Sequence, residues 1–215
     1  MASGRRDADG QEDHVLELWL IRHGETDWNA QRRIQGASDV PLNALGIWQA
    51  ERLQARLAGV PFDAVYASDL TRAHATATTA LPGADVRLDA RLRELSYGVL
   101  EGKAWSEMST EETAVADHWH EDPYTRRLPG GESYGDLTER VEAFRADLPE
   151  RGRVLAFSHG GTIRSALYAV FGRPNGAAWR VAIDNTSITR LHFDQRGVTV
   201  VSVNDSAHVG AGPLD

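Results

Sequence analysis

Short apolar runs alternate with amphipathic segments along the chain, and this alternation is typical of an α/β fold. Residues 15–21 end in four consecutive apolar residues, as expected of a parallel strand buried on both faces. Residues 43–58 carry apolar residues at nearly helical spacing, with Asn43 as the expected N-cap. The other predicted elements are strands at 64–67, 86–88 and 154–158, helices at 72–80, 133–148 and 162–171, and a hairpin of 186–193 and 198–203. This order predicts a three-layer α/β/α sandwich with a mostly parallel central sheet.

Two segments fall outside the alternating pattern. Residues 1–14 are polar and lack the apolar core of an export signal, so we expect a disordered N-terminal tail. Residues 103–131 mix acidic residues with scattered aromatic ones and predict a helical excursion from the sheet. The interior contains no linker, so we expect residues 15–209 to form a single domain.

Composition narrows the classes of partner. The formal net charge of −8 argues against binding nucleic acid through its phosphate backbone. No apolar run approaches the length of a transmembrane helix, so we expect a cytoplasmic protein that does not bind membranes. The chain has no cysteine, which excludes disulfides, thiolate catalysis and cysteine-ligated metals. The sequence leaves the oligomeric state open, with a homodimer as one alternative.

Two histidines follow predicted strands, and each is trailed by glycine. His23 stands between Arg22 and Gly24 after the first strand, and His159 precedes Gly160 after the strand at 154–158. Ligands of α/β proteins bind at the carboxyl ends of strands. An arginine beside a histidine suits an anion better than a metal ion, because the guanidinium repels cations. In an acidic chain these local charges must capture the anion, which indicates a small phosphorylated metabolite as ligand and no metal or other cofactor.

Four motifs occur in a fixed order along most of the chain. They are Arg22-His23-Gly24-Glu25-Thr26 with Trp28-Asn29, Ser68-Asp69-Leu70-Thr71-Arg72-Ala73 with Thr76-Ala77, Arg93-Glu94-Leu95 with Tyr97-Gly98 and Glu101-Gly102, and Ser158-His159-Gly160-Gly161. Together they resemble the histidine phosphatase superfamily, the phosphoglycerate mutase-like enzymes, over about residues 18–208. The resemblance implies a phosphoglycerate mutase-like catalytic domain, with 103–131 over its active site.

The resemblance also implies roles for particular residues. His23 is expected to attack phosphorus and form a phosphohistidine, and Glu94 to protonate the leaving oxygen and then activate water. Glu101 lies nearby in the sequence as a competing carboxylate. The expected phosphate-binding residues are Arg22, Asn29, Arg72, His159 (in its protonated form) and Gly160, of which Arg22, Arg72 and His159 also count as catalytic. Further candidates for substrate specificity are Gln35, Gly36, Tyr97, Arg126 and Arg127.

Two reactions fit these motifs. Cofactor-dependent mutases of the family carry a longer insert than the 64 residues, 95–158, between Glu94 and His159. They typically have asparagine at the position of Gly161 and serine at that of Thr26. Against this, Arg126-Arg127 resembles the paired arginines with which mutases bind a substrate carboxylate. We therefore expect a metal-independent phosphatase that hydrolyses phosphate monoesters of small metabolites, with a phosphoglycerate mutase using the same histidine as the alternative.

Overall fold

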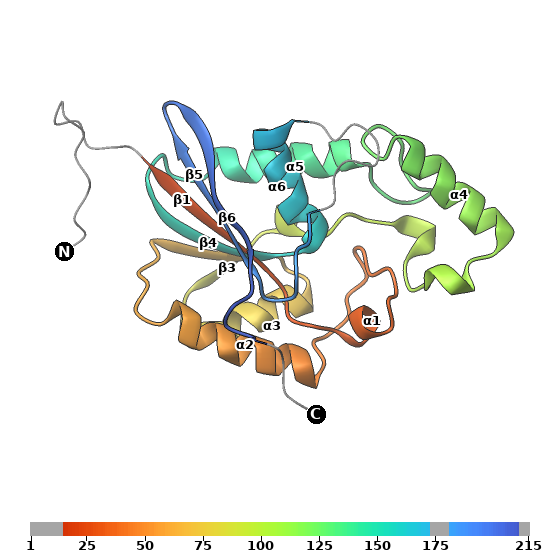
Figure 1. Cartoon of the computed structure of the whole chain (residues 1–215). Coiled ribbons are helices and arrows are strands. Elements are labelled where there is room, and N and C mark those ends of the chain that lie inside the picture. Colours follow the sequence, from red (N-terminus) through yellow and green to blue (C-terminus); the bar gives the residue numbers. More distant parts are fainter. Residues whose placement is uncertain (1–14, 173–180, 211–215) are drawn as a thin grey trace.

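A six-stranded sheet forms the centre of the molecule (Figure 1). The computed structural model describes residues 15–172 and 181–210, so the tail predicted at 1–14 lies outside the described residues. The strands are β1 (Leu16–Arg22), β2 (Ala64–Ala67), β3 (Val86–Leu88), β4 (Gly152–Ser158), β5 (Ile188–Asp194) and β6 (Gly197–Asp205), in the order β3-β2-β4-β1-β5-β6. The first four strands in this order pair in parallel, and β5 and β6 add an antiparallel hairpin at one edge. The mostly parallel sheet is confirmed.

Helices cover both faces of this sheet. In Figure 1, α2 and α3 lie on one side of the strands and α5 and α6 on the other. The helices are α1 (Asp27–Ala30), α2 (Ala44–Leu57), α3 (Thr71–Ala80), α4 (Thr110–Glu121), α5 (Tyr134–Ala146) and α6 (Gly160–Phe171). Alternate residues of β1 face the two layers: Leu18 and Leu20 pack against α5 and α6, and Trp19 and Ile21 against α2 and α3. The three-layer sandwich follows from this burial on both faces.

The capping residues in the sequence predicted the positions of the helices, but the predicted ends of two helices differ from those in the structure. The side chain of Asn43 caps α2 by accepting from the Gly46 amide at 2.8 Å, and Ser133 with Asp136 forms the capping box of α5. Helix α6 begins at Gly160, two residues earlier than predicted, and α5 ends at Ala146 instead of Leu148. The single turn α1 was not predicted, because four residues are too few to show a helical period.

The segment 103–131, the predicted excursion, contains α4 and a short 3-10 turn, Trp105–Glu107. Helix α4 has its own small apolar core with residues of α5 and the 95–100 region. Trp119 is the centre of this core, because its ring lies 5.7 Å from that of Tyr97 and 6.0 Å from that of Tyr134. Aromatic stacking therefore fixes the excursion against the main domain.

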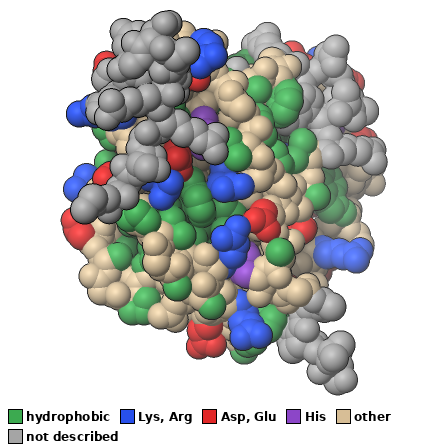
Figure 2. Space-filling view, turned by 60° about the vertical axis from the view of Figure 1, so that its left-hand side comes forward, with side chains coloured by type: hydrophobic (Ala, Val, Ile, Leu, Met, Phe, Trp, Pro, Cys, Tyr) green, Lys and Arg blue, Asp and Glu red, His purple; other side chains and the backbone are tan. Residues whose placement is uncertain are grey.

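The surface is mixed in charge. On the face shown in Figure 2, Lys and Arg side chains are interspersed with Asp and Glu, and the coloured atoms show no continuous basic area. Within the described ranges, none of the helices is both long and apolar enough to cross a membrane.

The loop after β1 lies directly on the start of α2. A Cβ atom on Gly24 would stand 2.5 Å from the carbonyl oxygen of Gly46, and one on Gly46 would stand 2.1 Å from the carbonyl oxygen of Glu25. The Glu25 carbonyl also accepts from the Asn43 amide at 3.0 Å. Two glycines thus allow backbone to pack on backbone immediately beside His23.

Replacing Gly46 by alanine is expected to lower the free energy of unfolding by about 1–3 kcal/mol, because the new methyl group must displace backbone atoms. Helix propensity alone would raise the free energy of unfolding, since alanine is favoured over glycine within helices by about 0.5–1 kcal/mol. Urea denaturation measures the difference. Ile47→Ala is the control, because the Ile47 side chain is exposed and its loss should change stability little. A Gly46→Ala variant as stable as the wild type would contradict this contact.

Candidate active site

The predicted catalytic residues converge at the carboxyl ends of the central strands. In the parallel pair β1–β4, Arg22 stands opposite Ser158, so His23 and His159 leave neighbouring strands at the same level. The amide of His23 donates to the carbonyl of Ser158 at 2.9 Å, and the two imidazole rings lie 5.1 Å apart between centroids. Arg72 comes from the first turn of α3, and Glu94 from the loop between β3 and the excursion.

Hydrogen bonding fixes the tautomer of His23. Its Nδ1 lies 2.6 Å from the carbonyl oxygen of Gly24, and because a carbonyl only accepts, Nδ1 carries the proton. The ring is almost completely buried, and burial lowers its pKa well below the ordinary value, with Arg72 and Arg22 adding to the effect. His23 is therefore neutral near pH 7 with the lone pair on Nε2, which is the state a nucleophile requires.

His159 has the opposite tautomer. Its Nδ1 accepts a hydrogen bond from Nε of Arg72 at 3.2 Å, so in the neutral ring the proton is on Nε2. Burial, followed by Arg72 and then His23, lowers the pKa of this histidine well below its usual value. The motifs predicted a protonated His159, and the structure favours a neutral ring instead, because Nδ1 accepts from Arg72 and burial lowers the pKa. The Nε2–H has no partner among the described residues and remains a donor for an anion.

Arg72 is a fully buried cation held by neutral groups. Its two terminal nitrogens donate to the carbonyls of Gly36 and Ser38, each at 2.7 Å, and Nε donates to His159. Burial lowers the pKa of its guanidinium, although Glu94, Asp39 and Glu101 act in the opposite direction. Buried charge is costly without a counter-charge, and no described carboxylate lies within ion-pair distance.

Arg22, the residue before His23, is also held by a backbone carbonyl. One terminal nitrogen donates to the carbonyl of Ile183 at 2.7 Å, and Nε is buried without a hydrogen-bond partner among the described residues. Burial lowers the pKa of Arg22 to about 10, with Glu94 opposing and Arg164 adding to the shift. Two guanidinium groups and an imidazole N–H thus belong to the immediate environment of His23, an arrangement suited to a phosphoryl group.

The structure separates the two candidate acids. One oxygen of Glu94 accepts from the Leu95 amide at 2.9 Å and the other from the Gly161 amide at 3.0 Å, at the start of α6. Glu101 instead accepts hydrogen bonds from four different residues, none of which is one of the two histidines. These donors are the amides of Ala37, Ser38 and Tyr97 and the hydroxyls of Ser38 and Ser96. Glu101 stabilises the loop whose carbonyls hold Arg72, and Glu94 is the carboxylate placed beside the histidine site.

Asn29 and a residue not predicted from the sequence complete the loop around His23. The side-chain oxygen of Asn29 accepts from the Thr26 amide at 3.2 Å and from the side-chain amide of Asn185 at 3.3 Å. Asn185 also donates to the carbonyl of His23 at 2.9 Å, and the next residue, Thr186, has a positive φ of 58°. A β-branched residue rarely adopts this conformation, so the β5 side of the site is locally strained. An asparagine before the last hairpin gives no signal of such a role.

Thr76 is a second residue that the sequence reasoning missed as a site residue. Its hydroxyl accepts from the Gly24 amide at 2.9 Å and donates to the carbonyl of Arg72 at 2.7 Å. One side chain thus joins the loop after His23 to the helix that carries Arg72. Its place in the second motif, four residues after Arg72 on α3, is the signal that could have found it.

Three of the candidates for specificity have contacts near the site, and two do not. Gln35 and Gly36 belong to the loop around Arg72, where Gln35 is buried and the Gly36 carbonyl accepts from Arg72. Tyr97 contacts Trp119 and shares a side-chain hydrogen bond with Tyr134. Arg126 and Arg127 instead pair with Glu121 and Asp136 respectively, and no described contact joins either arginine to the histidines.

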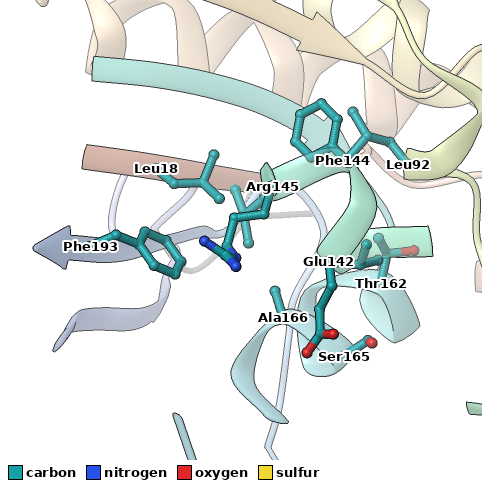
Figure 3. A pocket seen from close by; sticks show the side chains of 11 residues that line it. Leu18, Leu92, Glu142, Phe144, Arg145, Thr162, Ser165, Ala166 and Phe193 are labelled. Atoms are coloured by element: carbon teal, nitrogen blue, oxygen red, sulfur yellow. The ribbon is translucent and has the colours of Figure 1, made fainter. Parts of the chain in front are cut away.

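An apolar cavity lies on the face of the sheet that α5 and α6 cover, whereas Arg72 is carried by α3 on the other face. The cavity is therefore not the anion site. It is lined mainly by aliphatic and aromatic side chains of β1, α5, α6 and β5, with Thr162 at one end (Figure 3). Its free volume of about 20 Å³ is enough for about one water molecule. No group of three or more potential metal ligands occurs in residues 15–172 and 181–210.

Comparisons with known proteins agree on one family. A family model described as the histidine phosphatase superfamily (branch 1) matches residues 18–206. The chain is 36% identical over 211 residues to the probable phosphoglycerate mutase GpmB of Salmonella choleraesuis, covering 94% of this chain and 98% of that protein. The structure is similar to YhfR of Bacillus stearothermophilus, with a TM-score of 0.81, 33% identity and coverage of 90% and 98% of the two chains. It is also similar to a phosphoserine phosphatase of Entamoeba histolytica in complex with phosphoserine, with a TM-score of 0.78, 28% identity and coverage of 90% and 99%.

The fold and the two strand-end histidines define an enzyme of phosphoryl-transfer type. The chain belongs to the histidine phosphatase superfamily, and the resemblance in its four motifs is confirmed.

The two buried histidines should make stability depend on pH. Their pKa values are depressed in the folded state, so the unfolded chain binds more protons below about pH 6.5. Each histidine therefore contributes stability that is present above pH 6.5 and lost as the pH falls toward its folded-state pKa, with a limiting slope of about 1.4 kcal/mol per pH unit.

Urea denaturation between pH 7.5 and pH 5 measures this slope. His159→Gln should reduce it by about 1.4 kcal/mol per pH unit, and His118→Gln at the exposed surface serves as the control. Equal slopes in the wild type and His159→Gln would show that His159 is not held neutral.

Proposed function

We propose that this protein is a metal-independent phosphatase that hydrolyses phosphate monoesters of small metabolites through a phosphohistidine on His23. The observation that carries the proposal is the 2.6 Å contact from Nδ1 of His23 to the Gly24 carbonyl. This contact leaves Nε2 unprotonated, in a ring that lies beside His159 and is influenced by the charges of Arg22 and Arg72. A neutral nucleophile inside a cluster of fixed donors matches the requirements of phosphoryl transfer.

In the first step, Nε2 of His23 attacks phosphorus and the bond from phosphorus to the leaving oxygen breaks. Arg22, Arg72 and the Nε2–H of His159 stabilise the negative charge on the three equatorial oxygens, together with the side-chain amide of Asn29. Glu94, protonated before this step, gives its proton to the leaving oxygen. The products are an alcohol, a phosphohistidine and a carboxylate on Glu94.

In the second step, water attacks the phosphohistidine on the side that the alcohol has left. The Glu94 carboxylate accepts a proton from the water as the bond between phosphorus and Nε2 breaks. Inorganic phosphate forms, His23 returns to its neutral state and Glu94 is protonated again. Positive charge comes from arginines throughout, so no divalent ion is required.

Gly161 supports hydrolysis over the mutase reaction. A Cβ atom there would stand 2.2 Å from Oε1 of Glu94, so any larger residue would push this carboxylate from its place on the Gly161 amide. The asparagine expected of mutases is therefore incompatible with this position of Glu94. The Entamoeba relative, which is named a phosphoserine phosphatase, agrees with hydrolysis.

A phosphoglycerate mutase is the second candidate, because the Salmonella relative is named a probable phosphoglycerate mutase. The two reactions differ in the product released from the phosphoenzyme, which is inorganic phosphate for a phosphatase and an isomerised phosphoglycerate for a mutase. Incubation with 3-phosphoglycerate, scoring free phosphate and 2-phosphoglycerate separately, distinguishes them. Phosphate as the main product supports the phosphatase, and isomerised product in the presence of 2,3-bisphosphoglycerate supports the mutase.

His23→Ala is expected to lower kcat by about a thousandfold or more, because no other nucleophile lies within the cluster. Brief incubation of the wild type with a labelled monoester should trap a phosphoenzyme that is labile in acid and stable in alkali, as a phosphoramidate is. Turnover should survive exhaustive EDTA treatment. An acid-stable adduct, near-normal turnover in His23→Ala, or activity restored only by a divalent ion would each contradict the mechanism.

Glu94→Gln should affect substrates according to their leaving groups. A sugar phosphate leaves as a basic alkoxide, so its phosphoenzyme formation should slow by roughly 10² to 10⁴-fold. Formation from p-nitrophenyl phosphate should slow far less, because the phenolate leaves without a proton. Stopped-flow measurement of both rates tests this difference.

Glu101→Gln is the matched control for this test. Its carboxylate holds the loop around Arg72, so its loss should slow both esters by similar factors. A selective loss in Glu101→Gln would mean that the acid has been assigned to the wrong residue.

A further inference from the structure

Helix α6 places another guanidinium group beside the phosphate-binding residues. Nη1 of Arg164 lies 3.3 Å from the position that a Cβ on Gly160 would take, and Nε of Arg22 lies 3.8 Å from the same position. Arg164 is half-buried, and its Nε donates to the carbonyl of Val181 at 3.0 Å. Both arginines therefore border the first residue of α6, immediately after His159.

Within residues 15–172 and 181–210, no carboxylate lies within ion-pair distance of Arg164, so its charge has no direct counter-charge there. The bond to Val181 uses one of five guanidinium N–H groups. Arg164 can therefore hold the Val181 carbonyl through Nε while its terminal nitrogens bind an anion in a forked geometry.

Tyrosines extend from Arg164 to the excursion. Tyr168 lies one turn after Arg164 on α6, and its ring stands 5.8 Å from that of Tyr134, which in turn shares a hydrogen bond with Tyr97. Burial raises the pKa of all three phenols, while Arg164 acts in the opposite direction on each. The phenols are therefore neutral at physiological pH, and their hydroxyls do not oppose a bound anion.

This group of residues lies beside Glu94. Glu94, the proposed acid for the leaving oxygen, accepts from the amide of Gly161, one residue after the glycine that Arg164 borders. Glu94 also interacts electrostatically with Tyr97 and Tyr134. A substituent on the leaving alcohol would point toward Arg164, whereas Arg22 and Arg72 bind the phosphoryl group itself.

We propose that Arg164, with Tyr97, Tyr134 and Tyr168 beside it, forms a subsite for a carboxylate on the leaving group. The preferred substrates are then phosphate monoesters of small hydroxy acids. A single uncompensated guanidinium matches the single charge of a carboxylate, and its fork matches the two oxygens. This inference rests on the proposed phosphatase function. It replaces Arg126 and Arg127 as the carboxylate-binding arginines, because those two are paired with Glu121 and Asp136.

The test compares two esters that differ in one group, 3-phosphoglycerate and glycerol 3-phosphate. The wild type should have a kcat/KM at least tenfold higher for the carboxylate ester. In Arg164→Gln the ratio of the two kcat/KM values should fall by roughly 30-fold, a typical effect of losing a charged hydrogen-bonding pair. Arg164→Lys should retain part of the ratio, and Arg127→Gln, the matched control, should leave it unchanged.

Binding to the His23→Ala variant separates the subsite from the chemistry. Calorimetry should show that adding Arg164→Gln weakens binding of 3-phosphoglycerate about 30-fold more than binding of inorganic phosphate. Equal weakening of both ligands, an unchanged kcat/KM ratio, or a selective loss in Arg127→Gln would overturn the subsite. A wild type that binds 3-phosphoglycerate through Arg164 but releases no phosphate from any ester, p-nitrophenyl phosphate included, would instead contradict the proposed function alone.

Discussion

The fully buried guanidinium of Arg72 donates hydrogen bonds to two carbonyls and one imidazole, and other parts of the site are arranged around it. Its Nε determines which nitrogen of His159 carries a proton. Its charge helps to keep both histidines neutral. Because its partners are neutral, the positive charge remains available to an anion, and it acts with little screening in a buried site.

The two histidines divide the chemistry through their tautomers. His23 donates through Nδ1 and keeps a lone pair on Nε2, whereas His159 accepts at Nδ1 and keeps a proton on Nε2. One ring can therefore attack phosphorus while its neighbour donates to a phosphoryl oxygen. The parallel register of β1 and β4 brings the rings together, and hydrogen bonds from elsewhere in the chain make them different.

In the proposed reaction, recognition of the alcohol involves different parts of the fold from recognition of phosphate. The proposed phosphate-binding groups come from the ends of β1 and β4 in the central sheet and from α3, which packs on it. The leaving-group side is formed by α6, the start of α5 and the 95–100 region, against which the excursion packs through Trp119. Changes in the excursion can therefore alter substrate preference while the β1–β4 pair and its histidines keep their geometry.

The sequence by itself determined the sheet, most helices and the chemical class. The periods of apolar residues, the caps at Asn43 and Ser133 and the glycines after each histidine are local signals. The meeting of His23 with His159 also followed, since carboxyl ends of parallel strands share an edge.

Only the tertiary structure decided the protonation of His159, the bonding of Glu101 to the loop around Arg72, and the pairing of Arg126 and Arg127. Each depends on partners brought close by folding: Arg72 is 87 residues from His159, and Glu101 bonds a loop more than 60 residues away. Asn185 and Thr76 were missed for the same reason, because Asn185 donates to His23 and Thr76 accepts from Gly24, both far away in the sequence. A residue's type and spacing show what it is able to do, whereas its protonation state and its partners are set by the charges and hydrogen bonds that surround it after folding.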